Sequence, residues 1–109
     1  MPTITPVQLA EVAQLIADPG RANILSRLMD GRALTAGELA SIAGVTPQTT
    51  SSHLSKLVKC ELLAVEKRGR RRFYRLASPL VAQMLASMML VAGSRSSFRP
   101  PSVIDECDA

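Results

Sequence analysis

Positive charge is concentrated between residues 56 and 75 of the chain. Eight lysine and arginine residues fall in that stretch against two glutamates, a net charge of +6, whereas the whole 109-residue chain carries +4. Six of the eight lie in EKRGRRRFYR, residues 66–75. Basic side chains gathered on one segment are the electrostatic footprint of a polyanion partner, usually nucleic acid. A solvated charge run is the alternative that composition alone leaves open.

A polar helix face precedes this basic run. Residues 47–59 predict a helix, and an advance of about 100° per residue separates its two sides. The side expected to be buried carries Thr50, Leu54, Leu57 and Val58. The opposite side carries Gln48, Thr49, Ser52, Lys56 and Lys59. An amide can pair with an adenine edge, hydroxyls suit bases or phosphates, and lysines meet backbone oxygens, although an ordinary polar surface has the same composition.

The elements around this face decide between the two interpretations. Thr35 and Glu38 match a capping box that begins a helix ending at Gly44, and Thr46-Pro47 begins the next helix at once. After Cys60 the runs 62–67 and 72–77 predict two strands of a hairpin that turns through residues 68–71. Two short helices joined by a tight turn and followed by a basic hairpin predict a winged helix-turn-helix.

The candidate DNA contacts form two sets. The recognition-helix set consists of Thr46, Gln48, Thr49, Ser51, Ser52, His53, Lys56 and Lys59. The wing set, on the hairpin, consists of Lys67, Arg68, Arg70, Arg71 and Arg72. We expect the helix set to choose the sequence and the wing set to grip the phosphates.

Two outer helices complete the predicted domain. Apolar residues recur at helical spacing in 6–17 and again, rich in methionine, in 80–92, while Asp18-Pro19 begins a further helix. The fold class is therefore mostly α with a small β-hairpin, a winged helix-turn-helix of about five helices and a two-stranded wing. We assign residues 1–93 to this domain and residues 94–109 to a loose tail.

The chain resembles the ArsR/SmtB family of small bacterial winged-helix repressors. The resemblance covers residues 17–76 and rests on ADPGRANIL (17–25), ELASIAGVTPQTTSSHLSKL (38–57) and LLAVEKRGRRRFYRL (62–76). It implies a homodimer whose first and last helices form the interface, and a transcriptional repressor that places its recognition helix in the major groove of an inverted-repeat operator. The methionine-rich stripe fits such an interface, with packing inside the chain as the alternative. The interface residues expected are Leu9, Val12, Ile16, Val81, Met84, Leu85, Met88 and Met89.

The metal ligands common in that family are missing here. Thr35 and Gly37 stand where arsenic and lead sensors carry Cys-x-Cys, and residues 78–92 contain no Asp, His or Glu. No metal site and no cofactor are expected. Cys60 is interpreted as a core thiol, with a thiol or metalloid sensor formed by Cys60 and Cys107 as the sharper alternative. Glu61 stands where the family usually has a helix-ending glycine.

Other function classes fit the sequence poorly. One histidine, and no nucleophile–base group or phosphate-cradling glycine loop, argue against an enzyme. No apolar run is long enough to cross a membrane, and the N-terminus does not resemble a secretory signal, so the expected location is the cytoplasm. The partners expected are double-stranded DNA and a second copy of the chain. A winged domain that binds protein and has lost DNA reading is the alternative function.

Overall fold

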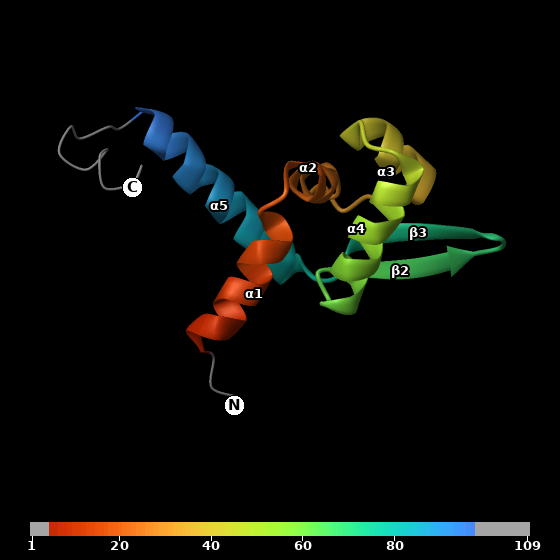
Figure 1. Cartoon of the computed structure of the whole chain (residues 1–109), viewed down its shortest axis with the longest axis horizontal. Helices are drawn as coiled ribbons and strands as arrows, with labels where there is room; N and C mark the ends of the chain where they lie inside the picture. The colour runs from red at the N-terminus through yellow and green to blue at the C-terminus, as the bar shows by residue number, and fades with distance from the viewer. Residues whose placement is uncertain (1–4, 98–109) are drawn as a thin grey trace.

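The computed structural model describes residues 5–97, and the side chains of residues 5–94. Its described residues form five helices and three strands (Figure 1). The helices are α1 (Pro6–Ile16), α2 (Pro19–Arg27), α3 (Ala36–Ala43), α4 (Pro47–Lys59) and α5 (Pro79–Ser97), and the strands are β1 (Leu34–Thr35), β2 (Leu63–Arg68) and β3 (Arg71–Leu76). The predicted winged helix-turn-helix architecture is confirmed. None of the helices described is long and apolar enough to cross a membrane.

Local capping explains where the helices of the helix-turn-helix begin. The Thr35 hydroxyl accepts the Glu38 backbone N–H at 3.2 Å, and the Glu38 carboxylate accepts the Thr35 N–H at 2.9 Å, so the predicted capping box is present. Gly44 ends α3 in the left-handed conformation, with φ of 68°. Two residues later, the Thr46 hydroxyl caps α4 by accepting the Thr49 N–H at 3.2 Å. The tight turn between α3 and α4 is therefore fixed by caps on both sides.

The sheet has one strand more than the sequence suggested. β1 pairs antiparallel with β3, Leu34 opposite Tyr74, and β3 pairs in turn with β2. The hairpin β2–β3 turns through Gly69 and Arg70, because Arg68 lies opposite Arg71. Gly69 has φ of 63°, which suits the first position of a two-residue hairpin turn. The two-stranded wing is therefore the outer part of a three-stranded sheet with the order β1-β3-β2.

One apolar core holds the helix-turn-helix against the sheet and the start of α5. Its buried members are Ile24, Leu25, Leu28, Leu39, Leu54, Leu57, Leu62, Leu63, Leu76, Val81 and Leu85. They come from α2, α3, α4, both long strands and α5, so every element that could face DNA is anchored to the same core. Val12, Leu15 and Ile16 of α1 pack on its edge.

α5 is longer than expected from the sequence. It continues through Gly93 to Ser97, so residues 94–97 are helical and only residues 98–109 of the predicted tail lie outside the described residues. A single glycine inside a helix costs about 1 kcal/mol relative to alanine, which a helix of this length tolerates. Residues 94–97 are therefore not the loose tail expected, while the domain boundary itself stays a prediction.

The end of α4 adopts a glycine-type turn without a glycine. The Leu62 N–H donates to the Leu57 carbonyl at 2.9 Å and the Glu61 N–H donates to the Val58 carbonyl at 3.0 Å, the two bonds of a Schellman motif. Glu61 has φ of 64° and is the only residue other than glycine with a positive φ among those described. The chain therefore holds Glu61 in a strained backbone conformation, and the buried pair Leu57 and Leu62 stabilises the turn.

His53 joins α4 to the start of α2. Its Nε2 lies 3.4 Å from the Asp18 carboxylate, and its side chain is only 13% exposed. Asp18 is the N-cap of α2 and accepts the Arg21 backbone N–H at 3.0 Å. A Cβ on Gly20 would come within 3.3 Å of His53 Nε2, so the missing side chain leaves room for this contact. The His53–Asp18 pair thus helps to set the position of α4 relative to α2.

Replacing Glu61 by glycine is expected to stabilise the protein. Glycine adopts positive φ without the clash that costs other residues about 1 kcal/mol, so Glu61→Gly should raise the free energy of unfolding by about that amount. Urea denaturation followed by circular dichroism measures the change. Glu61→Ala is the control, because it removes the carboxylate but keeps the strain and should give no gain. An equal gain in both variants would attribute the effect to charge instead.

Acidification is expected to weaken the Asp18 cap. The hydrogen bond from the Arg21 backbone is the main cause that lowers the pKa of the Asp18 carboxyl below its ordinary value of 3.8, and the nearby His53 side chain adds to it electrostatically. The stability contributed by the carboxylate is therefore complete above the ordinary pKa and lost as pH falls through the lowered one. Asp18→Asn keeps a capping oxygen without a charge. It should lose less free energy of unfolding than the wild type between about pH 5 and pH 3.

Denaturant titrations across that pH range test the Asp18 prediction. Glu11→Gln, on the exposed surface of α1, is the control for removing one carboxyl. An acid loss in Asp18→Asn as large as that in the wild type and in Glu11→Gln would contradict the assignment.

Candidate nucleic-acid interface

The two faces of α4 divide as the sequence predicts. Thr50, Leu54 and Leu57 are at most 1% exposed, and Val58 is half-buried. The exposed residues of the recognition-helix set are Thr46, Gln48, Thr49, Ser51, Ser52, Lys56 and Lys59. The core thus orients the polar face outward over the whole length of the helix.

Two members of that set also have structural roles. The Thr46 hydroxyl donates to the Thr49 hydroxyl at 3.0 Å in addition to capping α4, which leaves Gln48 as the longest polar side chain in the first turn. His53 does not share the exposure of the others, because it lies against Asp18 on the flank of the helix. The structure therefore assigns His53 to the packing of α2 against α4. That role depends on tertiary contacts which helical periodicity does not reveal.

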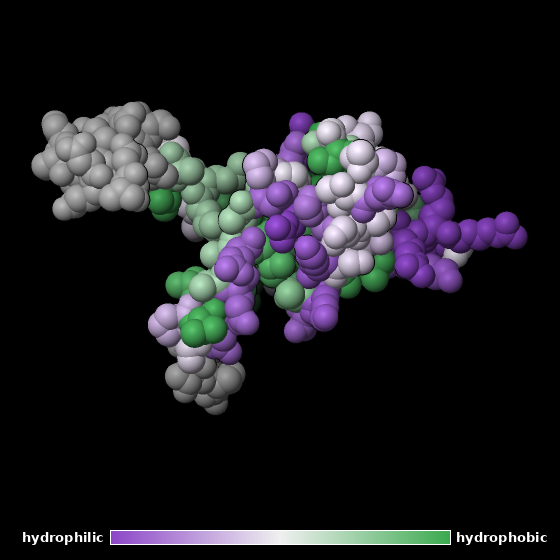
Figure 2. All heavy atoms as spheres, in the orientation of Figure 1, coloured by the Kyte–Doolittle hydropathy of each residue, from purple (hydrophilic) through white to green (hydrophobic). Residues whose placement is uncertain are grey.

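The hairpin carries the wing set as an exposed, charged projection. Lys67, Arg68, Arg70, Arg71 and Arg72 are all exposed. Figure 2 shows the hydrophilic residues of the wing gathered at the end of the molecule opposite α1 and α5. Because β2 and β3 are paired in register, the lysine and arginine side chains of the wing alternate between the two faces of the hairpin.

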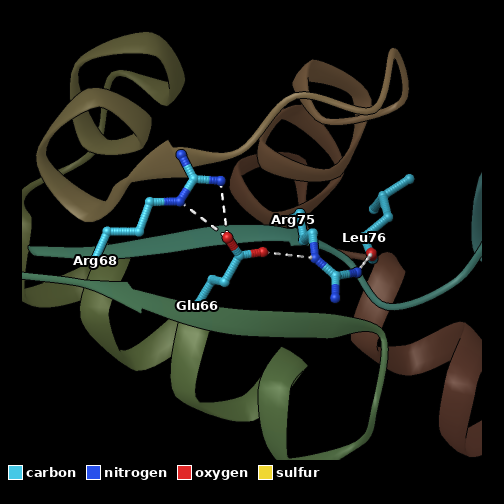
Figure 3. Close-up of polar contacts among 4 residues, drawn as sticks. All are labelled: Glu66, Arg68, Arg75 and Leu76. Atoms are coloured by element: carbon cyan, nitrogen blue, oxygen red, sulfur yellow. Dashed lines mark hydrogen bonds and ion pairs between the residues drawn. The ribbon is translucent and has the colours of Figure 1, made fainter.

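One face of the hairpin holds an ion-pair network that the sequence alone did not reveal. The Glu66 carboxylate lies between two arginines, with Arg68 Nη2 2.8 Å away and Arg75 Nε 3.3 Å away (Figure 3). The Arg68 guanidinium also lies 4.9 Å from the centre of the Phe73 ring, and that of Arg71 5.7 Å from it. Alternation along the strands could have suggested this group, since cross-strand pairing places Glu66 opposite Phe73.

The cysteine expectation is partly wrong. Cys60 is exposed at the C-terminal end of α4 and free, so it is not a core thiol. Cys107 lies outside the described residues, and a sensor formed by both cysteines stays a prediction. No group of three or more His, Cys, Asp and Glu side chains able to hold a metal occurs among the residues described. Thr35, at the position of the missing Cys-x-Cys motif, forms the capping box of α3 with Glu38.

The outer helices expose an apolar surface that differs from the predicted interface. Leu9, Met88 and Met89 are exposed, by 44% to 68%, and Val12, Ile16 and Met84 are half-buried. Val81 and Leu85 instead belong to the core of the chain, because the first turns of α5 pack on it. The sequence prediction omitted four residues that are at least 63% exposed: Val7, Leu80, Leu90 and Val91. Figure 2 shows apolar side chains over α1 and α5.

A family model for a helix-turn-helix domain matches residues 16–66. Among curated proteins, the chain is 46% identical over 84 residues to the uncharacterised HTH-type transcriptional regulator YdfF of Bacillus subtilis, which covers 77% of this chain and 37% of YdfF. It is 37% identical over 83 residues to the HTH-type transcriptional regulator CmtR of Mycobacterium tuberculosis, covering 76% of this chain and 70% of CmtR. The chain thus spans little more than a third of YdfF but most of CmtR.

Solved structures of similar proteins share the fold. The homodimeric winged helix-turn-helix DNA-binding domain of Mb0332 from Mycobacterium bovis, a possible ArsR-family transcriptional regulator, has a TM-score of 0.75 at 26% identity and covers 87% of this chain and 93% of that one. The antimony-specific transcriptional repressor AntR has a TM-score of 0.68 at 26% identity, covering 90% and 91%. With the architecture, the exposed recognition helix and these relatives in agreement, the chain belongs to the ArsR family of winged helix-turn-helix transcriptional regulators.

Proposed function

We propose that this regulator is a sequence-specific transcriptional repressor that binds an inverted-repeat operator as a homodimer. The observation that carries the proposal is the pairing of an exposed polar face on α4 with an exposed basic hairpin on the same core. α4 is 13 residues long, about 20 Å, and a helix of this kind fits the major groove, which is about 12 Å wide. Gln48, Thr49 and Ser52 would then face base edges, and Lys56 and Lys59 the phosphates.

The apolar surface of α1 and α5 supports the homodimer. Leu80 and Leu90 are both more than 70% exposed, and surfaces of this kind mark interaction sites. The Cα radius of gyration is 15.9 Å, whereas a compact domain of about 100 residues has about 13 Å. Figure 1 shows the reason, since α1 and α5 extend from the body on the side away from the wing. The Mb0332 domain, with the same fold, is a homodimer.

An inverted-repeat operator and a repressor role are consistent with this arrangement. A symmetric dimer presents two copies of α4, so the matching DNA is an inverted repeat with half-sites about one helical turn apart, roughly 34 Å. A dimer bound across such a site obstructs a promoter that overlaps it. AntR, which has this fold, is a transcriptional repressor.

The protein is expected to bind a specific duplex with a steep dependence on salt. If roughly six phosphates are neutralised in each complex, log K should fall with log salt at a slope of about −5. The probe is a duplex enriched from a randomised library by the wild-type protein, and fluorescence anisotropy measures its affinity. Gln48→Ala should relax sequence discrimination, whereas Arg70→Ala/Arg72→Ala should weaken all duplexes alike and flatten the salt slope.

The control for the charge change is the double variant Arg27→Ala/Arg32→Ala, which also removes two exposed arginines, at the end of α2 and in the loop after it, outside both contact sets. It should change neither discrimination nor salt slope. Failure of the wild type to enrich any sequence, with a flat salt response, would contradict the proposal and favour a protein-binding winged domain.

A charge on the apolar surface is expected to split the dimer. Met89 is 56% exposed on α5, so Met89→Glu would bury a carboxylate in the proposed interface, which is costly. Analytical ultracentrifugation should show dimers of wild type and monomers of Met89→Glu, and affinity for the enriched duplex should fall by about a hundredfold or more as the two half-sites uncouple. Ser41→Glu adds the same charge at an exposed position of α3, outside the apolar surface of α1 and α5, and should remain dimeric. A dimeric Met89→Glu would place the interface elsewhere.

A further inference from the structure

The basic residues of the wing are not equivalent. The strand register places Glu66, Arg68, Arg71, Phe73 and Arg75 on one face of the hairpin. Lys67 and Arg72 lie opposite each other on the other face. Of these basic side chains, only Arg68 and Arg75 form ion pairs within the part of the chain described, and both pair with Glu66. Among the residues described, Arg68 is thus the one member of the wing set with a carboxylate partner.

The contact geometry leaves the outer end of the Arg68 guanidinium open. Its Nε donates to Glu66 Oε2 at 2.9 Å and its Nη2 lies 2.8 Å from the same oxygen, so one edge of the fork faces the carboxylate. The guanidinium plane is also held near the Phe73 ring, 4.9 Å from its centre. The Arg68 side chain is nevertheless 58% exposed. Its remaining Nη donors are therefore presented in a restrained orientation next to the hairpin turn.

Glu66 is itself anchored from the base of the wing. Its other oxygen, Oε1, accepts Arg75 Nε at 3.3 Å, and Arg75 Nη1 donates to the Leu76 carbonyl at 3.1 Å (Figure 3). Hydrogen bonds and charge from Arg68, and then from Arg75, hold the pKa of the Glu66 carboxyl below its usual range. The carboxylate is therefore ionised at neutral pH and has little freedom to move away from Arg68.

Two roles for this carboxylate are possible in a DNA-binding wing. As a charge, it opposes the binding of phosphate. An exposed pair of charges changes a binding constant by a factor of at most about five, and salt screens the effect. As a positioning group, it restricts the rotamers of Arg68 before DNA binds. The entropy that would otherwise be lost when DNA orders this long side chain is then not lost on binding. The two-sided anchoring by Arg68 and Arg75 favours positioning, since opposition to phosphates needs no such geometry.

We propose that Arg68 reads the minor groove beside each half-site and that Glu66 is the residue that positions it for this purpose. The inference rests on the proposed DNA-binding function and deepens it. An arginine entering the minor groove favours narrow A·T-rich segments, where the negative potential is strongest. The wing then contributes to sequence choice through one oriented arginine, while Lys67, Arg70 and Arg72 supply phosphate contacts without sequence preference.

The experiment compares two versions of the duplex enriched by the wild-type protein. One keeps A·T pairs in the segments flanking the two half-sites, and the other carries G·C pairs there. Wild type should prefer the A·T flanks by about fivefold or more, the size of one mismatched base pair. Glu66→Gln keeps the size of the side chain and removes its charge, and it should lose most of this preference while retaining its affinity for the half-sites. Glu61→Gln is the matched control for loss of one carboxylate, and it should keep the preference.

A double-mutant cycle separates positioning from charge. In an Arg68→Ala background, Glu66→Gln should have no further effect on the flank preference, because the two residues act through one contact. If Glu66→Gln instead tightens binding to both duplexes equally and does so in either background, Glu66 acts only as an opposing charge and the inference is wrong. A wild type that binds its half-sites but ignores the flanks also overturns it and leaves the proposed function intact. Circular dichroism melts of each variant identify any loss of folding.

Discussion

The structure depends on the burial of one side of α4. Leu54 and Leu57 are almost fully excluded from solvent, and Thr50 joins them in the same stripe. In a helix of 13 residues, fixing that stripe fixes the opposite face as well, because side chains cannot rotate around the axis independently. The polar face from Gln48 to Lys59 is therefore positioned by apolar contacts on its far side. In a chain this small, the same core also has to hold α2, α3 and the sheet. The packing of the core therefore determines where the recognition surface lies.

The features that could be predicted from the sequence are those determined locally. The starts of α2, α3 and α4 follow from Asp18, Thr35 and Thr46, whose side chains accept a backbone N–H three residues ahead. A capping residue needs no tertiary information, and the same holds for the hairpin turn at Gly69. The polar face of α4 was predictable for a similar reason, since helical periodicity alone divides it from the buried face.

The features that were missed depend on contacts distant in sequence. β1 has only two residues and exists because Leu34 and Thr35 pair with Tyr74 and Phe73 of β3. Cys60 was expected in the core, but the turn at Glu61 places it at an exposed helix end. Val81 and Leu85 share an apolar stripe with Met88 and Met89, and periodicity cannot say where along α5 the core of the chain ends. The ion pairs of Glu66 with Arg68 and Arg75 could be predicted only with the register of β2 and β3 known.

The recognition helix, the wing and the outer helix meet at a single backbone contact. Leu62 follows the turn that ends α4, and its carbonyl accepts the Ala77 N–H at 3.0 Å. Ala77 and Ser78 are the only residues between β3 and α5. With Leu62 and Leu76 both buried, this short link has little freedom to bend. In the proposed dimer, the packing of the two α5 helices would therefore set the distance between the two wings and the two copies of α4. Half-site spacing would be a property of the dimer interface, while base preference would belong to α4 and to the oriented arginine on the wing.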